Sequence, residues 1–127
     1  MTSREIIHTD KAPAAIGPYS QAVKVGNTLY CSGQICIDPS NGELNNATIE
    51  AETQQVMKNI GAVLEAAGMD YSNVVKVTIF MRDMGDYAAI NGVYAQYFTT
   101  NPPAREAVAV KTLPKEVGVE ISVTAVQ

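Results

Sequence analysis

The chain has 127 residues, of which 46% are apolar and 17% are charged, and its formal net charge is −4. This length fits a single domain, residues 1–127, and the composition is typical of a compact globular protein rather than a disordered one. The acidic balance, with no run of Lys or Arg, argues against a nucleic-acid partner, which would require a basic stripe.

The sequence also argues against membrane insertion and secretion. No segment reaches the ~18 consecutive apolar residues of a membrane-spanning helix. The N-terminal stretch MTSREIIHTDK carries charges, but the apolar core of a secretion signal does not follow it. We therefore expect a cytoplasmic protein with no membrane partner.

The first half of the chain predicts a β-hairpin followed by a helix. Residues 21–25 (QAVKV) and 28–35 (TLYCSGQI) are expected strands, and the Gly-Asn pair between them suits a type II′ turn. A further strand is possible near the N-terminus, at REIIH. After a turn-rich loop over residues 37–46, apolar residues recur at helical spacing up to the stop at Gly68. These residues are Ile49, Val56, Met57, Ile60, Val63, Leu64 and Ala67.

The second half predicts a strand, a helix and two closing strands. Residues 74–82 (VVKVTIFMR) are branched and apolar, which favours a strand. A second helix is expected to begin at Asp86, a favourable N-cap. Residues 105–112 (REAVAVKT) and 117–126 (VGVEISVTAV) are the last two expected strands. The inward stripe of the second helix comprises Tyr87, Ile90, Val93, Tyr94, Tyr97 and Phe98.

This order of elements predicts an α+β fold. The two strand–helix–strand units imply right-handed crossovers, so both helices should lie on one face of a mixed sheet of five or six strands. The strand at residues 74–82 carries bulky side chains on both of its faces, and two helices cover only one. We therefore expect a second subunit to cover the other face, and hence an oligomer.

Several templates for chemistry are missing from the sequence. It contains no GxGxxG, Walker loop, HExxH, CxxC or GxSxG motif. The only histidine is His8, so neither a Ser-His-Asp triad nor a histidine metal site is expected. Cys31 and Cys36 are an odd number of residues apart, which points them to opposite faces of one strand. We expect small buried hydrophobic residues here rather than a disulfide or a metal pair.

Two charged residues in apolar strands are candidates for a site. Arg105 shares one strand face with Ala107 and Ala109, and these small neighbours leave room for a guanidinium that grips a carboxylate with two hydrogen bonds. The alternative is an arginine at a solvated strand end. Glu120 interrupts the branched run VGVEISV, where it lies either on a solvated face or under a neighbouring subunit that must satisfy its charge.

Two glycine-containing segments are further candidates. Ser32-Gly33 interrupts an apolar strand, which indicates either a simple bulge or the close approach of a ligand to the backbone. Gly17-Pro18 forms a turn that presents Tyr19, either as a site residue or as a packed loop tyrosine.

Five segments together resemble the RidA (YjgF) family: APAAIGPYSQAV, SGQI, VKVTIFMRDMGDYAAINGVYAQYF, PPAREAVAV and LPKEVGVEISVTAV. The likeness runs from about residue 12 to the end, with only short insertions and deletions. It implies a chorismate-mutase-like α+β fold and a homotrimer with three clefts between subunits. It also implies hydrolytic deamination of reactive 2-imino acids, such as 2-iminobutanoate and 2-iminopropanoate, without a metal or an organic cofactor.

The resemblance also implies roles for individual residues. Arg105 would bind the substrate carboxylate, and Glu120 would position the attacking water. Tyr19 would complete the catalytic set by packing on the substrate. Further substrate contacts would come from residues that match the family pattern, namely Ser32, Gly33 and Asn91.

One position departs from the family pattern. Many active members have a cysteine two residues after the arginine, where this chain has Ala107. If that position acts through its backbone N–H, alanine serves as well as cysteine, and we favour this interpretation.

Two other functions remain open from the sequence. The same clefts could bind 2-oxo acids without catalysis. A surface role, such as RNA cleavage or a chaperone-like function, is the other alternative. The acidic charge and the lack of a histidine pair count against RNA cleavage.

Overall fold

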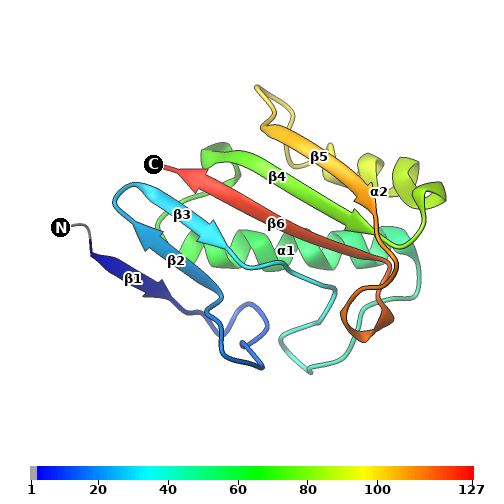
Figure 1. Ribbon diagram of the computed structural model, residues 1–127, viewed down its shortest axis with the longest axis horizontal. Helices are drawn as coiled ribbons and strands as arrows, with labels where there is room; N and C mark the ends of the chain where they lie inside the picture. Colours follow the sequence, from blue (N-terminus) through cyan, green and yellow to red (C-terminus); the bar gives the residue numbers. More distant parts are fainter. Residues whose placement is uncertain (1–2) are drawn as a thin grey trace.

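A mixed six-stranded sheet forms the centre of the molecule in the computed structural model, which describes residues 3–127. The strands follow the spatial order β1-β2-β3-β6-β4-β5, and only the β4–β5 pair is parallel (Figure 1). The strands are β1 (Arg4–Ile7), β2 (Ala22–Val25), β3 (Thr28–Cys31), β4 (Val74–Met81), β5 (Ala104–Ala109) and β6 (Val119–Val126). The helices are α1 (Ile49–Ala66) and α2 (Tyr87–Tyr94), with short 3₁₀ turns at Tyr71–Asn73, Met84–Asp86 and Pro114–Glu116.

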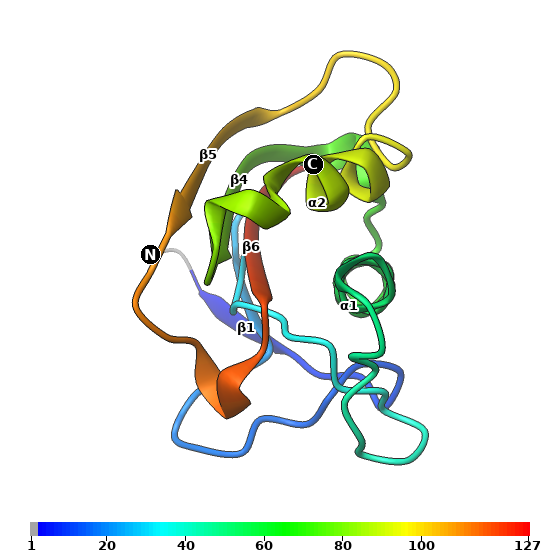
Figure 2. The same cartoon turned by 90° about the vertical axis from the view of Figure 1, so that its right-hand side faces the viewer.

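The predicted order of elements is confirmed, including the extra N-terminal strand. Figure 2 shows both helices on the same side of the sheet, as expected. The β2–β3 hairpin turns through Gly26, whose φ of +59° fits the type II′ turn. Within residues 3–127, no helix is long and apolar enough to cross a bilayer.

Several expected elements have different bounds in the structure, and β5 and β6 are both shorter than the expected strands. The strand expected at residues 28–35 stops at Cys31, and only Gln34 resumes pairing, through a bridge to Ile121. The second helix has Asp86 at its N-cap position, as expected, and a 3₁₀ turn capped by the Asp83 carboxylate precedes it. It ends at Tyr94, so Tyr97 and Phe98 of the expected stripe lie beyond the helix. Asp86 makes no side-chain capping bond, so its predicted role as a capping side chain is wrong.

Strand β4 shows how the sheet divides the molecule. Its buried residues Val77, Ile79 and Met81 face the helices and join the core beneath α1. The alternate residues lie on the opposite side, which we call the open face. The side chains on this face of the sheet, from β1 to β5, are Arg4, Ile6, Val23, Val25, Thr28, Tyr30, Glu120, Ser122, Thr124, Val126, Lys76, Thr78, Phe80, Ala104, Glu106 and Val108.

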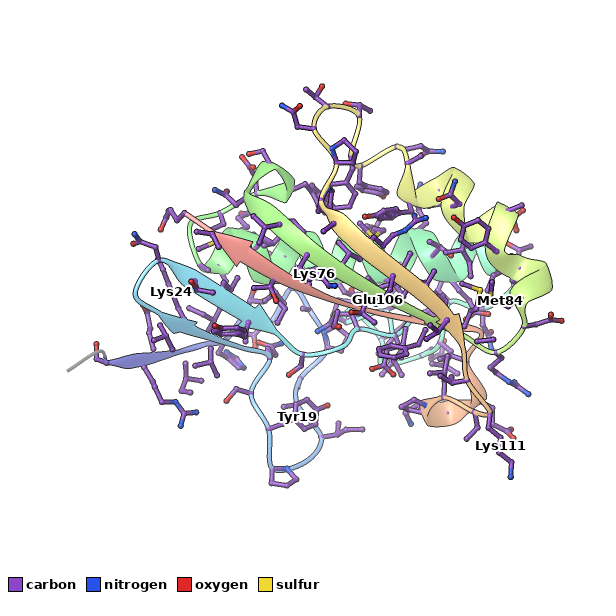
Figure 3. The ribbon with its side chains drawn as sticks, turned by 45° about the horizontal axis from the view of Figure 1, so that its top comes forward. Tyr19, Lys24, Lys76, Met84, Glu106 and Lys111 are labelled. Atoms are coloured by element: carbon purple, nitrogen blue, oxygen red, sulfur yellow. The ribbon has the colours of Figure 1, made fainter. Side chains whose placement is uncertain are left out.

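The open face is mixed rather than wholly apolar. Lys76 and Glu106 form an ion pair of 2.6 Å between β4 and the edge strand β5, and Thr78 donates to the same carboxylate (Figure 3). The hydrogen bond from Lys76 has the larger effect and that from Thr78 the smaller, and together they hold the pKa of Glu106 below its usual range. Around this pair, Tyr30 and Val108 are 55% and 42% exposed. The part of the face around this pair can be covered without leaving Lys76 or Glu106 unpaired.

Buried amides hold the loops next to the sheet. The side-chain NH₂ of Asn59, on α1, donates to the carbonyls of Ile35 and Ile37 at 3.1 and 2.9 Å. The Gln21 side chain bonds the segment before β2 in the same way: it accepts from the N–H of Thr9 at 2.8 Å and donates to the carbonyls of Thr9, Ala12 and Pro13. Both amides are almost fully buried, so they fix loops that would otherwise be free.

Replacing Gln21 by alanine is expected to destabilise the protein by about 3 kcal/mol, because it leaves buried backbone groups of the loop unsatisfied. The measurement is the denaturant midpoint at fixed protein concentration. Gln96→Ala removes the same side chain from an exposed position and should change stability by less than ~0.5 kcal/mol. Equal midpoints for the two variants would contradict the proposed role of Gln21.

Candidate functional site

The guanidinium of Arg105 lies on the helix side of the sheet. Parallel pairing aligns Arg105 with Val77, so its side chain points toward α2. Nη1 donates to Oδ1 of Asn91 at 2.8 Å, and Nη2 donates to the hydroxyl of Tyr87 at 2.6 Å. The Cζ atom is 4.9 Å from the ring centre of Tyr94. These contacts hold a cation with neutral groups only, because no acidic side chain within residues 3–127 forms an ion pair with it.

Arg105 also borders a hollow at the end of α2. A guanidinium has five N–H donors, and two of them donate to Asn91 and Tyr87, so others are available to a ligand. The hollow has a volume of about 470 Å³. It is lined by Asn91, Tyr94, Ala95, Phe98, Pro102, Pro103 and Arg105. This arrangement suits the binding of a small anion such as a carboxylate.

The backbone of β5 offers a further donor. The N–H of Val110 donates to Met81 of β4, so the N–H groups of alternate residues point toward β4. The N–H of Ala107 therefore points the other way, to the free edge of the sheet. Every residue except proline leaves that donor in place, which fits an alanine as well as a cysteine.

The carboxylate of Glu120 lies on the open face. Glu120 on β6 is paired with Phe80 on β4, and its side chain borders a cavity of about 400 Å³. The Glu120 side chain makes no hydrogen bond to any residue from 3 to 127. Burial raises the pKa of this carboxyl above its usual range. The cavity is lined by Pro13, Ala14, Ile16, Tyr19, Gln21, Ser32, Gly33, Gln34, Ile35, Ile37, Pro114, Lys115 and Glu120.

Gly33 leaves the space that the Glu120 side chain fills. A Cβ added at Gly33 would lie 2.9 Å from Cδ and 3.1 Å from Cγ of Glu120, and closer still to one carboxylate oxygen. The φ of Gly33 is not in the left-handed region, so the glycine is needed here for space rather than for backbone freedom. The predicted close approach to this glycine is therefore made by a side chain of the protein.

Replacing Gly33 by alanine is expected to displace the Glu120 carboxylate and to lower the rate of any reaction it serves by about tenfold or more. Because the displaced atoms are the end of a flexible side chain, the stability should change by only ~1 kcal/mol. Turnover and thermal unfolding measured together check this. Gly92→Ala is the control, since its added Cβ would meet no heavy atom within 4 Å in the part of the chain that the structure describes.

Ser32 and Tyr19 line the same cavity in different ways. The hydroxyl of Ser32 donates to the carbonyl of Ser20 at 2.6 Å, so its proton is already used to hold the loop. Tyr19 is 51% exposed, and its ring lies on the loop before β2 (Figure 3). It is therefore free to pack on a ligand.

The candidate residues form two groups on opposite sides of one sheet. Arg105, Asn91 and Ala107 belong to the helix side and the β5 edge, whereas the Glu120 group belongs to the open face. Strand β4 lies between β5 and β6, so the last two strands do not form a hairpin and Arg105 does not face Glu120. One chain therefore does not bring the two charged groups together.

Two residues near these groups were missed as site candidates. Tyr87 was expected only in the inward stripe of its helix, although it precedes Asn91 by one helical turn. Lys115 lines the Glu120 cavity and has a φ of +55°, which no pattern in LPKEVG indicates. Among residues 3–127, no group of three or more His, Cys, Asp and Glu side chains could hold a metal ion.

Comparisons with known proteins place this geometry in a family. Residues 9–127 match the family model described as Endoribonuclease L-PSP. The human 2-iminobutanoate/2-iminopropanoate deaminase is 50% identical over 124 residues, which are 98% of this chain and 90% of the human protein. A crystal structure of a Rid-family protein from Yersinia pestis is 47% identical, with a TM-score of 0.96, covering 98% of this chain and all of that one.

This chain belongs to the RidA (YjgF) family. It has the chorismate-mutase-like fold of that family, as the sequence indicated. Another solved relative is TdcF from E. coli with bound serine, which is 40% identical with a TM-score of 0.93, over 97% of this chain and 98% of that one. The names within the RidA family differ, since the family model names a ribonuclease and the human relative a deaminase.

Proposed function

We propose that the protein hydrolyses reactive 2-imino acids, such as 2-iminobutanoate and 2-iminopropanoate, to 2-oxo acids and ammonia. The observation that carries this proposal is the Arg105 guanidinium, which neutral side chains hold beside a hollow with donors available to a ligand. A 2-imino acid presents the matching carboxylate next to its C=N bond. The name of the human relative and the serine bound to TdcF support the same class of ligand.

Each group of the candidate site would have one task. Arg105 would bind the carboxylate with two hydrogen bonds, and the free N–H of Ala107 would orient it. Tyr19 would pack on the substrate. Ser32, Gly33 and Asn91 would shape the surroundings, with Asn91 acting on the guanidinium that it already contacts.

Glu120 would manage the protons of the reaction. Its carboxylate takes a proton from a water molecule as the water oxygen adds to the carbon of the C=N bond. Glu120 would return this proton to the nitrogen, which gives the carbinolamine. The hydroxyl proton of the carbinolamine would then pass through the same carboxylate to the nitrogen as the C–N bond breaks, so that ammonia leaves, a C=O group forms and Glu120 is again ionised. Burial of Glu120 raises its pKa, and this makes it a better base at neutral pH than an ordinary glutamate.

A homotrimer would complete the site. Because Arg105 and Glu120 lie on opposite sides of the sheet, a cleft that holds both needs two subunits. β5 is an edge strand, so a neighbouring chain can approach the Arg105 group there. The open face, with its exposed Tyr30 and Val108, offers the surface that assembly would cover.

A coupled assay tests the reaction. A threonine dehydratase releases 2-iminobutanoate, and added protein should speed the formation of 2-oxobutanoate above the spontaneous rate. Binding of 2-oxobutanoate without any acceleration would show a carboxylate-binding module instead of an enzyme.

A mixing experiment tests the shared site. Arg105→Ala and Glu120→Gln subunits should each be inactive alone. After joint unfolding and refolding at equal amounts, about a quarter of the clefts would contain one intact Arg105 and one intact Glu120. Recovery of activity toward that fraction supports sites shared between subunits, and a mixture as inactive as its components contradicts them.

A further inference from the structure

Helix α2 presents three side chains to the guanidinium of Arg105. Tyr87, Asn91 and Tyr94 follow one another at intervals of four and three residues, so they share one face of the helix. The hydroxyl of Tyr87 accepts from Nη2, the amide oxygen of Asn91 accepts from Nη1, and the ring of Tyr94 lies 4.9 Å from Cζ. Each terminal nitrogen is therefore held by a different residue of the same rigid element.

This arrangement restricts the guanidinium more than either contact would alone. The side chain of a free arginine has many rotamers, and a ligand that needs one of them must overcome that freedom on binding. Turning the guanidinium about its Nε–Cζ bond would break both hydrogen bonds at once. Asn91 alone would leave Nη2 free to move, so the Tyr87 hydroxyl is the contact that completes the restraint.

We infer that Tyr87 is a positioning residue, whose hydroxyl fixes Arg105 in the orientation that receives a carboxylate. Its expected effect on turnover rests on the proposed function, whereas its effect on Arg105 and on carboxylate binding does not. Because Tyr87 acts through the anchor, it should strengthen the binding of substrate and transition state equally.

Tyr87→Phe removes only the hydroxyl and keeps the ring beside the guanidinium. Its Kd for 2-oxobutanoate should rise about tenfold. The KM for imine should rise by a similar factor, with kcat changed less than about twofold. The matched control is Tyr97→Phe, because the Tyr97 hydroxyl donates to Gln54 at the same distance of 2.6 Å, without a contact to Arg105. The control should leave both constants unchanged.

The arginine side chains report the restraint directly by ¹⁵N NMR. The chain has three arginines, and the Arg105 resonance is identified by its absence from Arg105→Ala. In the natural protein its Nη resonances should be separate because rotation is slow, and in Tyr87→Phe they should merge. Arg82, which donates from Nη1 to the carbonyl of Glu116 at 2.8 Å, is an internal control that should not change.

Several outcomes would overturn the inference. Unchanged Arg105 resonances in Tyr87→Phe, or a changed Kd without any change in them, would show that Tyr87 does not act through Arg105. An unchanged or tighter Kd would show that the contact does not serve binding. If the unsubstituted protein binds 2-oxobutanoate but does not hydrolyse imine, the proposed function is contradicted. The inference about Tyr87 is then still tested by the NMR and Kd measurements.

Discussion

Arg105→Ala is expected to lower kcat/KM for 2-imino acids by at least about 100-fold, because two hydrogen bonds to a charged group contribute ~1.5–3 kcal/mol each. The Kd for 2-oxobutanoate should rise to a similar extent. Arg105 is only half-buried, and the acceptors it leaves behind border a hollow that water can enter, so unfolding should change little. The coupled assay and a binding titration measure the two effects.

Arg4→Ala is the control for charge. Arg4 is an exposed arginine on the opposite edge strand, β1, and its removal should leave kcat/KM unchanged. Arg105→Lys keeps the charge but lacks the planar fork, so most of the loss should remain. A fully active Arg105→Ala protein would remove Arg105 from the proposed site.

Glu120→Gln is expected to lower kcat by about 10²- to 10⁴-fold, since a general base contributes a factor of this size. The Kd for 2-oxobutanoate should stay within about twofold of the natural value, because the anchor is intact. Glutamine matches glutamate in shape and Gly33 leaves room for it, so folding should be preserved. Undiminished turnover would exclude Glu120 from the chemistry.

The difference in stability between Glu120→Gln and the natural protein is expected to depend on pH. Burial raises the pKa of Glu120, so ionisation of this carboxyl favours the unfolded chain. This unfavourable contribution is absent below the ordinary glutamate pKa of about 4.3 and is complete once the pH has risen above the folded value. Glu120→Gln should therefore unfold at a higher temperature than the natural protein at about pH 8, and the difference should vanish near pH 4.

The sequence predicted the elements of the fold better than their ends. The core contains the buried branched residues of β4 and the apolar residues that recur along α1. Hydrophobic periodicity determines the structure of such buried elements, so the sequence predicts them well. Asp86 is at the N-cap position of α2, as expected, but the capping side chain is that of Asp83, three residues earlier, and it caps a 3₁₀ turn. The choice between the two aspartates follows from backbone geometry that a periodic pattern does not contain.

The candidate site was predictable residue by residue but not as an arrangement. Alternation alone placed Arg105 beside the small side chains Ala107 and Ala109, and the register of the sheet agrees. The placement of Arg105 and Glu120 on opposite sides depends on the registers of β5 and β6 against β4, which are long-range pairings. The contact of Tyr87 with Arg105 depends on how α2 packs across from β5, and no local pattern encodes that distance.

The close contact between Gly33 and Glu120 predicts that the two positions change together in evolution. Since the glutamate occupies the place of a missing Cβ, substitutions at the two positions are not independent. A descendant that keeps the carboxylate must keep the glycine, whereas a lineage that has lost the carboxylate is released to acquire a side chain at position 33. Paralogues that have abandoned the ancestral chemistry should therefore carry changes at both positions, and the pair should covary across an alignment.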